Sequence, residues 1–343
     1  MMRKVKIFVT YYTDDKPIIK SDIYQPIMAG NMGKALPDGF IGDDTGDNIS
    51  HLNNTYGEMT AHYWLWKNYL PTAKEEYIGL CHYRRFLNFS GNKYDFSEKK
   101  ETEWSPLDML YYKYFVRFMF SDCTENSILD KIDGYDLVTT KKWHFRNTNR
   151  MEFDYWHPGI VLDQAMDILD AQFPEYTPYA KKFFSDTEGY YCLCFIMKRE
   201  LLVSFLEWQF KIVKELDKIN TNLGYTDDHY MRTPAFIMER FYNIWIRYQI
   251  GKNKVKLLEM PAFKLDFDMP PEKRIKYLKN LASNKMPIGD DDMDELAARH
   301  PVLNGIIKPL VNQKKYYKLL GDPRRFFSDS SSIMIRLFGV FYK

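Results

Sequence analysis

Short strand-forming runs alternate with helix-forming segments over the first 145 residues, and this order limits the folds that the chain can adopt. The runs at 5–12, 77–81 and 135–140 are rich in β-branched and aromatic residues. Between the first two runs, apolar residues recur at spacings of three and four, at Tyr56, Met59, Tyr63, Trp66 and Leu70. This alternation predicts an α/β layered domain with a partly parallel sheet.

The start of the first helix carries its own signal. Thr55 and Glu58 have the spacing of a capping box, in which both side chains bind backbone amides of the first turn. Pro71 then ends the helix. On this interpretation Glu58 supports the helix start and does no chemistry. Further helices are predicted at 159–171, at 199–219 and from Thr233–Pro234 to about 248, the last with Thr233 as its N-cap and Pro234 at its first helical position. A strand is predicted at 190–197.

Composition excludes several classes of protein. The chain has 343 residues with 48 Lys+Arg against 46 Asp+Glu, and this balance argues against a dedicated nucleic-acid binder. Its four cysteines form no Cys-x-x-Cys pair, so we expect reduced thiols and a cytoplasmic protein. No apolar stretch approaches the roughly 20 residues that span a bilayer.

Polar and cationic residues follow each predicted strand. Thr10 and Tyr11 end the first run, residues 82–85 (His-Tyr-Arg-Arg) follow the second, and Lys141 follows the third. Ligands of open α/β sheets bind at the carboxyl ends of the strands. Clustered cations there suit an anionic ligand such as a diphosphate. The alternative is a solvated basic loop.

Residues 42–50 place three carboxylates, a hydroxyl and an amide between and just after two glycines. Such a segment can bind a cation, a ribose diol or sugar hydroxyls, or it can be a Gly-Asp turn held by its own side chains. No dinucleotide fingerprint, Walker loop, zincin motif or nucleophile elbow occurs in the chain.

Two later segments mix carboxylate, imidazole and aromatic groups, a combination that suits sugar rings or an ordinary surface turn. They are residues 154–157 and 225–229. Glu239 lies in the helix that starts at Thr233–Pro234. It projects roughly 200° away from the apolar stripe that begins at Ile237, so it faces solvent or a cleft.

An ordered set of these residues resembles a family of bacterial capsule and exopolysaccharide glycosyltransferases that has long been described as a domain of unknown function. The set comprises 47–50, Asn53, Tyr56, Glu58, Thr60, Tyr63–Trp64, 66–68 and 77–85. Residues 195–198 and 236–241 are similar to later segments of the family, and the resemblance spans about residues 4–250. The chain departs from the family at Leu193–Cys194.

The resemblance implies a GT-A-like fold with a mixed central sheet, and a nucleotide sugar as donor, with a UDP-sugar of galactose or galactofuranose expected first. The His-Tyr-Arg-Arg segment stands where GT-A enzymes usually carry an Asp-x-Asp metal motif. Either the arginine pair takes the place of Mn²⁺ or Mg²⁺ at the diphosphate, or acidic residues elsewhere bind the cation; both alternatives stay open.

These considerations assign roles to individual residues. The nucleotide-sugar site is predicted to comprise Thr10, Tyr11, Asp47, Asn48, Ser50, His82, Tyr83, Arg84, Arg85 and Lys141. A carboxylate from Glu239, Asp227 or Asp228 is predicted to deprotonate the acceptor hydroxyl, with inversion at the sugar carbon. The acceptor is predicted to contact Tyr155, Trp156, His157 and His229.

We expect a GT-A-like domain over 1–260 and a helical, basic appendage over 261–343. Residues 307–343 hold eight Lys/Arg against two Asp, interleaved with aromatics. Such a tail either lies on the inner face of the cytoplasmic membrane or packs as a helix on the domain. The main hypothesis is a glycosyltransferase that builds capsule, O-antigen or exopolysaccharide on a saccharide or lipid-linked acceptor. The alternative is a non-catalytic carbohydrate-binding or assembly protein with the same fold.

Overall fold

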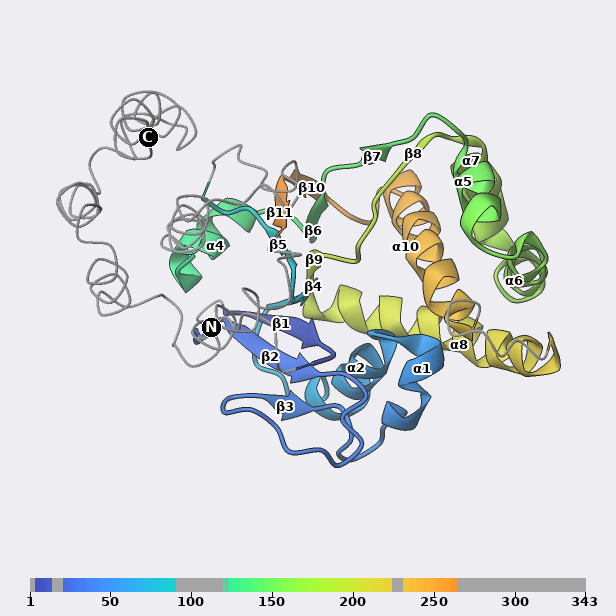
Figure 1. Cartoon of the computed structure of the whole chain (residues 1–343). Helices are drawn as coiled ribbons and strands as arrows, with labels where there is room; N and C mark the ends of the chain where they lie inside the picture. The colour runs from blue at the N-terminus through green and yellow to red at the C-terminus, as the bar shows by residue number, and fades with distance from the viewer. Residues whose placement is uncertain (1–3, 14–20, 91–119, 121–122, 224–230, 265–343) are drawn as a thin grey trace, which may run out of the picture. The chain divides into compact units, whose positions relative to one another are not determined.

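The computed structural model describes residues 4–13, 21–90, 120, 123–223 and 231–264 (Figure 1). It divides the chain into two compact units, residues 1–87 with 124–262 and residues 88–123 with 263–343. The sheet and helices that carry the site belong to the first unit. The predicted appendage at 261–343 lies almost wholly outside the described residues, and its boundary stays a prediction.

A mixed sheet forms the centre of the first unit, as predicted for an α/β fold. Its strands follow the order β10-β6-β9-β4-β1-β2-β3. β9 is antiparallel to both of its neighbours, β4 and β6, whereas the other pairs along this order are parallel. The strands are β1 (Val5–Tyr11), β2 (Tyr24–Met28), β3 (Ile41–Gly42), β4 (Tyr77–His82), β6 (Leu137–Thr140), β9 (Phe195–Lys198) and β10 (Leu257–Met260).

Strand register places the core on one face of this sheet. Phe8 of β1 pairs with Leu80 of β4, and both belong to the main hydrophobic cluster. The opposite face is also buried, and Gly79 allows close packing there. A Cβ atom at Gly79 would lie 2.9 Å from side-chain carbons of Ile7 and Ile196, so the position excludes larger residues.

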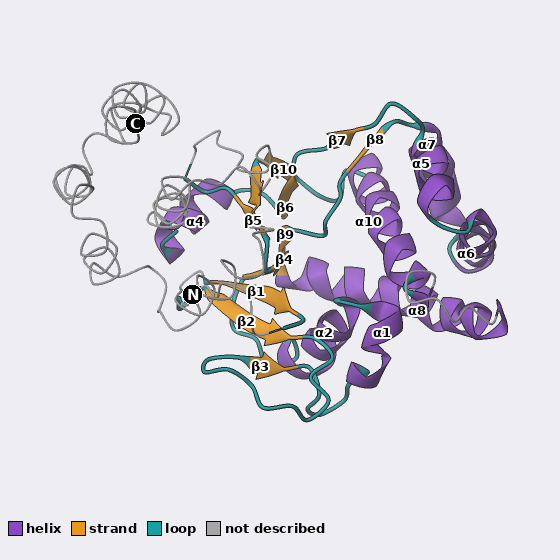
Figure 2. Cartoon of the chain, viewed as in Figure 1, coloured by secondary structure: helices purple, strands orange, loops and turns teal. Residues whose placement is uncertain are grey.

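Helices cover the sheet and form the remainder of the unit (Figure 2). The predicted helices at 159–171 and 199–219 are confirmed as α6 and α8. The helix predicted from Thr233 is confirmed as α10, although its N-cap residue is Arg232. The bounds are α1 (Asn53–Tyr56), α2 (Met59–Trp64), α4 (Glu125–Ile132), α5 (Asn149–Trp156), α6 (Gly159–Gln172), α7 (Thr177–Ser185), α8 (Arg199–Leu223) and α10 (Thr233–Gly251).

Short elements connect these helices and strands. A π-helical segment, η2 (Leu65–Tyr69), continues α2, and two 3-10 turns are η1 (Ser50–Leu52) and η4 (Pro174–Tyr176). β5 (Arg85–Leu87) pairs with β4, β7 (Trp143–His144) pairs with β8 (Glu188–Gly189), and β11 is Ala262–Lys264.

None of the four cysteines forms a disulfide: Cys81 and Cys194 are buried, and Cys123 and Cys192 are partly exposed. Within the described ranges, no helix has the length and hydropathy needed to cross a lipid bilayer.

Candidate active site

The carboxyl ends of β1 and β4 lie side by side, as the sequence predicts. Thr10 pairs in register with His82, and the Tyr83 amide donates to the Thr10 carbonyl at 3.0 Å. The Tyr12 ring centroid lies 5.5 Å from that of His82. Thr10 and His82 are buried, and among the described residues neither the Thr10 hydroxyl nor His82 Nδ1 has a hydrogen-bond partner.

The β4–β5 hairpin places both predicted arginines, Arg84 and Arg85, at this edge. His82 of β4 pairs with Arg85 of β5, so Tyr83 and Arg84 form the tip of a two-residue turn. The Tyr11 ring packs against Tyr83 with centroids 5.9 Å apart, and the Arg84 guanidinium lies 5.7 Å from the Tyr83 ring centroid. Lys141 also follows a strand, but its strand β6 is separated from β4 by β9.

Glu58 lies at this edge, and the capping-box prediction for it is wrong. Thr55 sits inside α1, which ends at Tyr56 with Gly57 as its C-cap, and Glu58 precedes α2 without capping it through its side chain. Gly57 has φ +54, which favours glycine. A Cβ atom there would lie 3.1 Å from Arg232 Nη2 and 3.8 Å from the Tyr12 hydroxyl. Gly57 therefore breaks the helix, and because it has no side chain, Arg232 and Tyr12 can lie close to its backbone.

Glu239 reaches the same region from α10. One carboxylate oxygen accepts a hydrogen bond from the Cys192 amide at 2.7 Å, and the other accepts from Arg240 Nη1 at 2.7 Å. Its side chain is 21% exposed, in agreement with the prediction that it avoids the main core face. Cys192 and Leu193 have φ values of 74° and 34°. This left-handed turn aims the amide at Glu239 and delays the predicted strand until Phe195.

The charged side chains at this edge shift the pKa values of Glu58 and His82. Burial of the Glu58 carboxyl group and the nearby charge of Glu239 raise its pKa from 4.5 to about 7, although Arg85, Arg232 and Arg84 oppose the shift. Burial and the same three arginines lower the pKa of His82 to about 3, which keeps the imidazole neutral. Five residues thus form one group, here termed the strand-end cluster: Glu58, Arg84, Arg85, Arg232 and Glu239.

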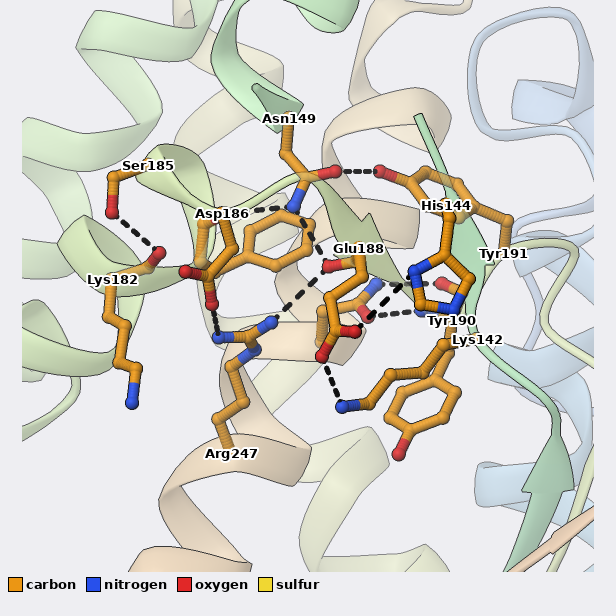
Figure 3. A network of polar contacts seen from close by, with 12 residues as sticks. Lys142, His144, Asn149, Lys182, Ser185, Asp186, Glu188, Tyr190, Tyr191 and Arg247 are labelled. Atoms are coloured by element: carbon orange, nitrogen blue, oxygen red, sulfur yellow. Dashed lines mark hydrogen bonds and ion pairs between the residues drawn. The ribbon is translucent and has the colours of Figure 1, made fainter. Parts of the chain in front are cut away.

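A hydrogen-bonded network fixes the segment that leads to Cys192 (Figure 3). The Asn243 side chain accepts from the Tyr190 amide and donates to the Tyr190 carbonyl at 2.7 Å. The Tyr191 hydroxyl donates to Asn149 Oδ1 at 2.8 Å, and Arg247 forms an ion pair with Asp186. Because α5 and α10 hold the segment from both sides, the Cys192 amide is positioned toward Glu239.

The loop at 42–50 is held by its own side chains. Asp43 is fully buried and accepts hydrogen bonds from the Gly30 and Asn31 amides and from the Ser50 and Thr60 hydroxyls. This is the turn alternative that the sequence left open. Ser50, predicted to bind nucleotide sugar, therefore donates its hydroxyl within the protein.

The two neighbouring loop residues also make internal contacts. Asp47 accepts from the Tyr63 hydroxyl at 3.0 Å, and Asn48 donates to backbone carbonyls of Asp44 and Gly46. Their predicted ligand contacts stay predictions. Across the described ranges, no group of three or more His, Cys, Asp or Glu side chains is arranged to hold a metal ion.

The residues predicted to bind the acceptor separate into two groups. Tyr155 and Trp156 are 77% and 60% exposed on α5, with ring centroids 4.9 Å apart. His157 is buried and stacks on Phe236 in the first turns of α10, with centroids 4.3 Å apart. Asp227, Asp228 and His229 lie outside the described residues.

Sequence reasoning missed the roles of Glu58 and Arg232. Gly57 inside an otherwise helical pattern was the available signal for Glu58, because an internal glycine often marks a break. Arg232 has no local signal. Packing of α1 against α10, elements far apart in the sequence, brings it to the cluster.

Comparisons with known proteins agree with this fold. The family described as "Domain of unknown function (DUF4422)" matches residues 6–250. Among solved structures, the chain is similar to the WbbM bifunctional glycosyltransferase in its apo form, with 28% identity and a TM-score of 0.62. The match covers 78% of this chain and 47% of WbbM, so the chain spans about half the length of that protein. This likeness is consistent with the predicted GT-A-like fold. Among curated proteins, none matches.

Proposed function

The chain belongs to the DUF4422 family, and we propose that it is a glycosyltransferase that moves a sugar from a nucleotide-sugar donor to a saccharide acceptor. One observation carries the proposal: the strand-end cluster gathers three guanidinium groups and two carboxylates at the carboxyl edge of the sheet. That edge is where α/β folds bind ligands. The structural likeness to a bifunctional glycosyltransferase supports the same conclusion.

Arg84, Arg85 and Arg232 are assigned to the donor diphosphate. Guanidinium groups bind phosphate oxygens in bidentate geometry and can neutralise a departing diphosphate. The buried Thr10 hydroxyl and His82 Nδ1 lie beside them, without hydrogen-bond partners among the described residues. A ligand at this edge can supply those partners, which favours binding because an unpaired buried polar atom costs free energy.

Glu58 is the proposed general base. Its pKa of about 7 suits proton abstraction near neutral pH. Glu239, the base predicted from the sequence, already accepts hydrogen bonds at both oxygens. We therefore assign Glu239 to raising the proton affinity of Glu58 through its charge. Direct attack of the acceptor hydroxyl then gives inversion; Asp227 and Asp228 stay predicted alternatives for the base.

The acceptor is assigned to the exposed pair Tyr155 and Trp156. Their rings are open to sugar faces, which aromatic side chains contact well. His157 is assigned a positioning role, because its stacking on Phe236 places α5 against the helix that carries Glu239.

The finer details of the proposal come from the sequence resemblance. The donor is proposed to be a UDP-sugar of galactose or galactofuranose, and the product a capsule, O-antigen or exopolysaccharide chain. Whether donor binding requires Mn²⁺ or Mg²⁺ is examined in the thermal-shift experiment described below. The protein is proposed to act at the inner face of the cytoplasmic membrane, which it would bind through the basic tail at 307–343.

A thermal-shift screen of UDP-sugars, with and without Mn²⁺ and with chelator, tests donor binding. A ligand that binds the native state raises the melting temperature by mass action. We expect a shift with at least one UDP-sugar for the wild type and for the exposed control Arg146→Ala. We expect no shift for the double variant Arg84→Ala/Arg85→Ala.

Two results would change the conclusion. No shift with any UDP-sugar contradicts the donor assignment. A shift without release of UDP when saccharide acceptors are added supports the alternative, a non-catalytic carbohydrate-binding protein.

A further inference from the structure

A groove of about 480 Å³ lies between the helix that follows the 42–50 loop and α8. It is here termed the lysine groove. Residues from η1, α1, α2, η2 and α8 line it, among them Leu52, Trp66, Lys67, Phe210, Lys211 and Lys214. Its volume is in the range of small-ligand sites. The strand-end cluster shares none of its lining residues.

The aromatic side chains that line the groove pack against one another. The Trp66 and Phe210 rings are parallel, with centroids 5.7 Å apart, and Tyr63 meets both rings edge-on. The Lys67 ammonium lies 3.6 Å from the Trp66 ring centroid. These contacts occupy ring surface that a sugar or base would need for stacking. What the groove offers a ligand is mainly ring edges and aliphatic carbon, for example from Leu52 and Val213.

The charges around the groove are unbalanced. Lys211 and Lys214 are exposed on α8, and no carboxylate of the described chain forms an ion pair with them or with Lys67. The single acidic lining residue, Asp217, accepts a hydrogen bond from the buried Tyr56 hydroxyl. Three ammonium groups therefore surround an apolar floor, a combination that complements an anion attached to a hydrocarbon chain.

We propose that the lysine groove binds a single-chain lipid phosphate, with the hydrocarbon against Leu52, Phe210 and Val213 and the phosphate among the lysines. The apolar walls account for the chain, and the three cations account for a doubly charged head. A free phosphate ion would leave the apolar floor unused. A neutral amphiphile would leave the cations unpaired.

The groove and the strand-end cluster are separate sites. Trp66 follows Glu58 by eight residues along α2 and η2, which corresponds to roughly 12 Å of helix rise. Ligand binding in the groove can therefore be measured without a donor sugar. Failure of this proposal would leave the proposed transferase activity untouched.

Isothermal titration of the full chain with dodecyl phosphate, held below its micelle concentration, tests the proposal. The comparison ligands are dodecyl maltoside, which shares the chain, and inorganic phosphate, which shares the charge. We expect dodecyl phosphate to bind at one site per chain and at least about tenfold more tightly than either comparison ligand.

Removing the charge should remove the affinity. The double variant Lys211→Gln/Lys214→Gln is expected to weaken dodecyl phosphate binding by about tenfold or more. The control Lys181→Gln/Lys182→Gln removes two exposed lysines from α7 and should bind as the wild type does. Equal binding by both double variants, equal binding of dodecyl maltoside, or tight binding of inorganic phosphate alone would each overturn the proposal.

Discussion

Replacing Glu58 with glutamine removes the carboxyl group whose pKa the strand-end cluster raises from 4.5 to about 7. Because the folded state holds this proton more tightly than the unfolded state, stability falls as pH rises between these two values. Each pKa unit corresponds to about 1.4 kcal/mol, so the wild type should lose up to about 3 kcal/mol of unfolding free energy between pH 5 and pH 8. In Glu58→Gln this loss should be absent.

Urea unfolding at pH 5, 6, 7 and 8 measures the difference. The control is Glu207→Gln, which removes an exposed carboxylate from α8 and should follow the wild-type pH dependence. The same titration governs catalysis, because a protonated Glu58 cannot accept the acceptor proton. Turnover should therefore rise with pH and reach half its plateau near pH 7.

One result would refute this reasoning. If the wild type and Glu58→Gln lost stability in parallel between pH 5 and pH 8, the Glu58 carboxyl would be ionised throughout this range. Its burial beside Glu239 would then not control its charge, and the assignment of Glu58 as base would lose its physical ground.

Three further substitutions and one control variant test the surrounding structure. Asp43→Ala removes the acceptor of four hydrogen bonds, although the Thr60 hydroxyl keeps the Gly57 carbonyl as an acceptor. It should lower the unfolding free energy by about 3 kcal/mol or more; a loss under about 1 kcal/mol in urea unfolding would contradict this network. Gly57→Ala should lower the unfolding free energy by about 1–3 kcal/mol, because φ +54 with ψ −131 is a conformation that L residues rarely adopt, and it should also weaken UDP-sugar binding, because the added Cβ crowds Arg232. The control Gly134→Ala, at a glycine with φ +78 and open space where the Cβ would lie, should lower stability but leave UDP-sugar binding unchanged. Asn243→Ala removes the side chain that binds the Tyr190 amide and carbonyl, and it should lower both the melting temperature and the turnover rate. An unchanged turnover rate would show that this network does not position the active site.

The central strands were predictable from the sequence, and the outer strands β2, β3 and β10 were not. The runs that became β1, β4 and β6 are buried on both faces, so they read as continuous apolar segments. β2 contains Gln25 and Pro26, residues that weaken a strand pattern, although parallel neighbours on both sides secure it.

Some residues of the candidate site were likewise predictable from the sequence, and others were not. The arginines of the hairpin were predictable because they follow a recognisable strand directly. The role of Glu58 was missed, because the capping-box spacing of Thr55 and Glu58 was given more weight than Gly57, which marks a helix break. Arg232 reaches the cluster through contacts between α1 and α10. Such long-range packing leaves no periodic trace in the sequence around it.

Release of UDP from a UDP-sugar in the presence of a saccharide acceptor tests the central claim most directly. The wild type and Arg146→Ala should release UDP in proportion to the glycoside formed. Arg84→Ala/Arg85→Ala should lose about a hundredfold or more in rate, because a departing diphosphate would lack its cationic partners. Equal UDP release by all three proteins would contradict the claim that the strand-end cluster binds the donor diphosphate.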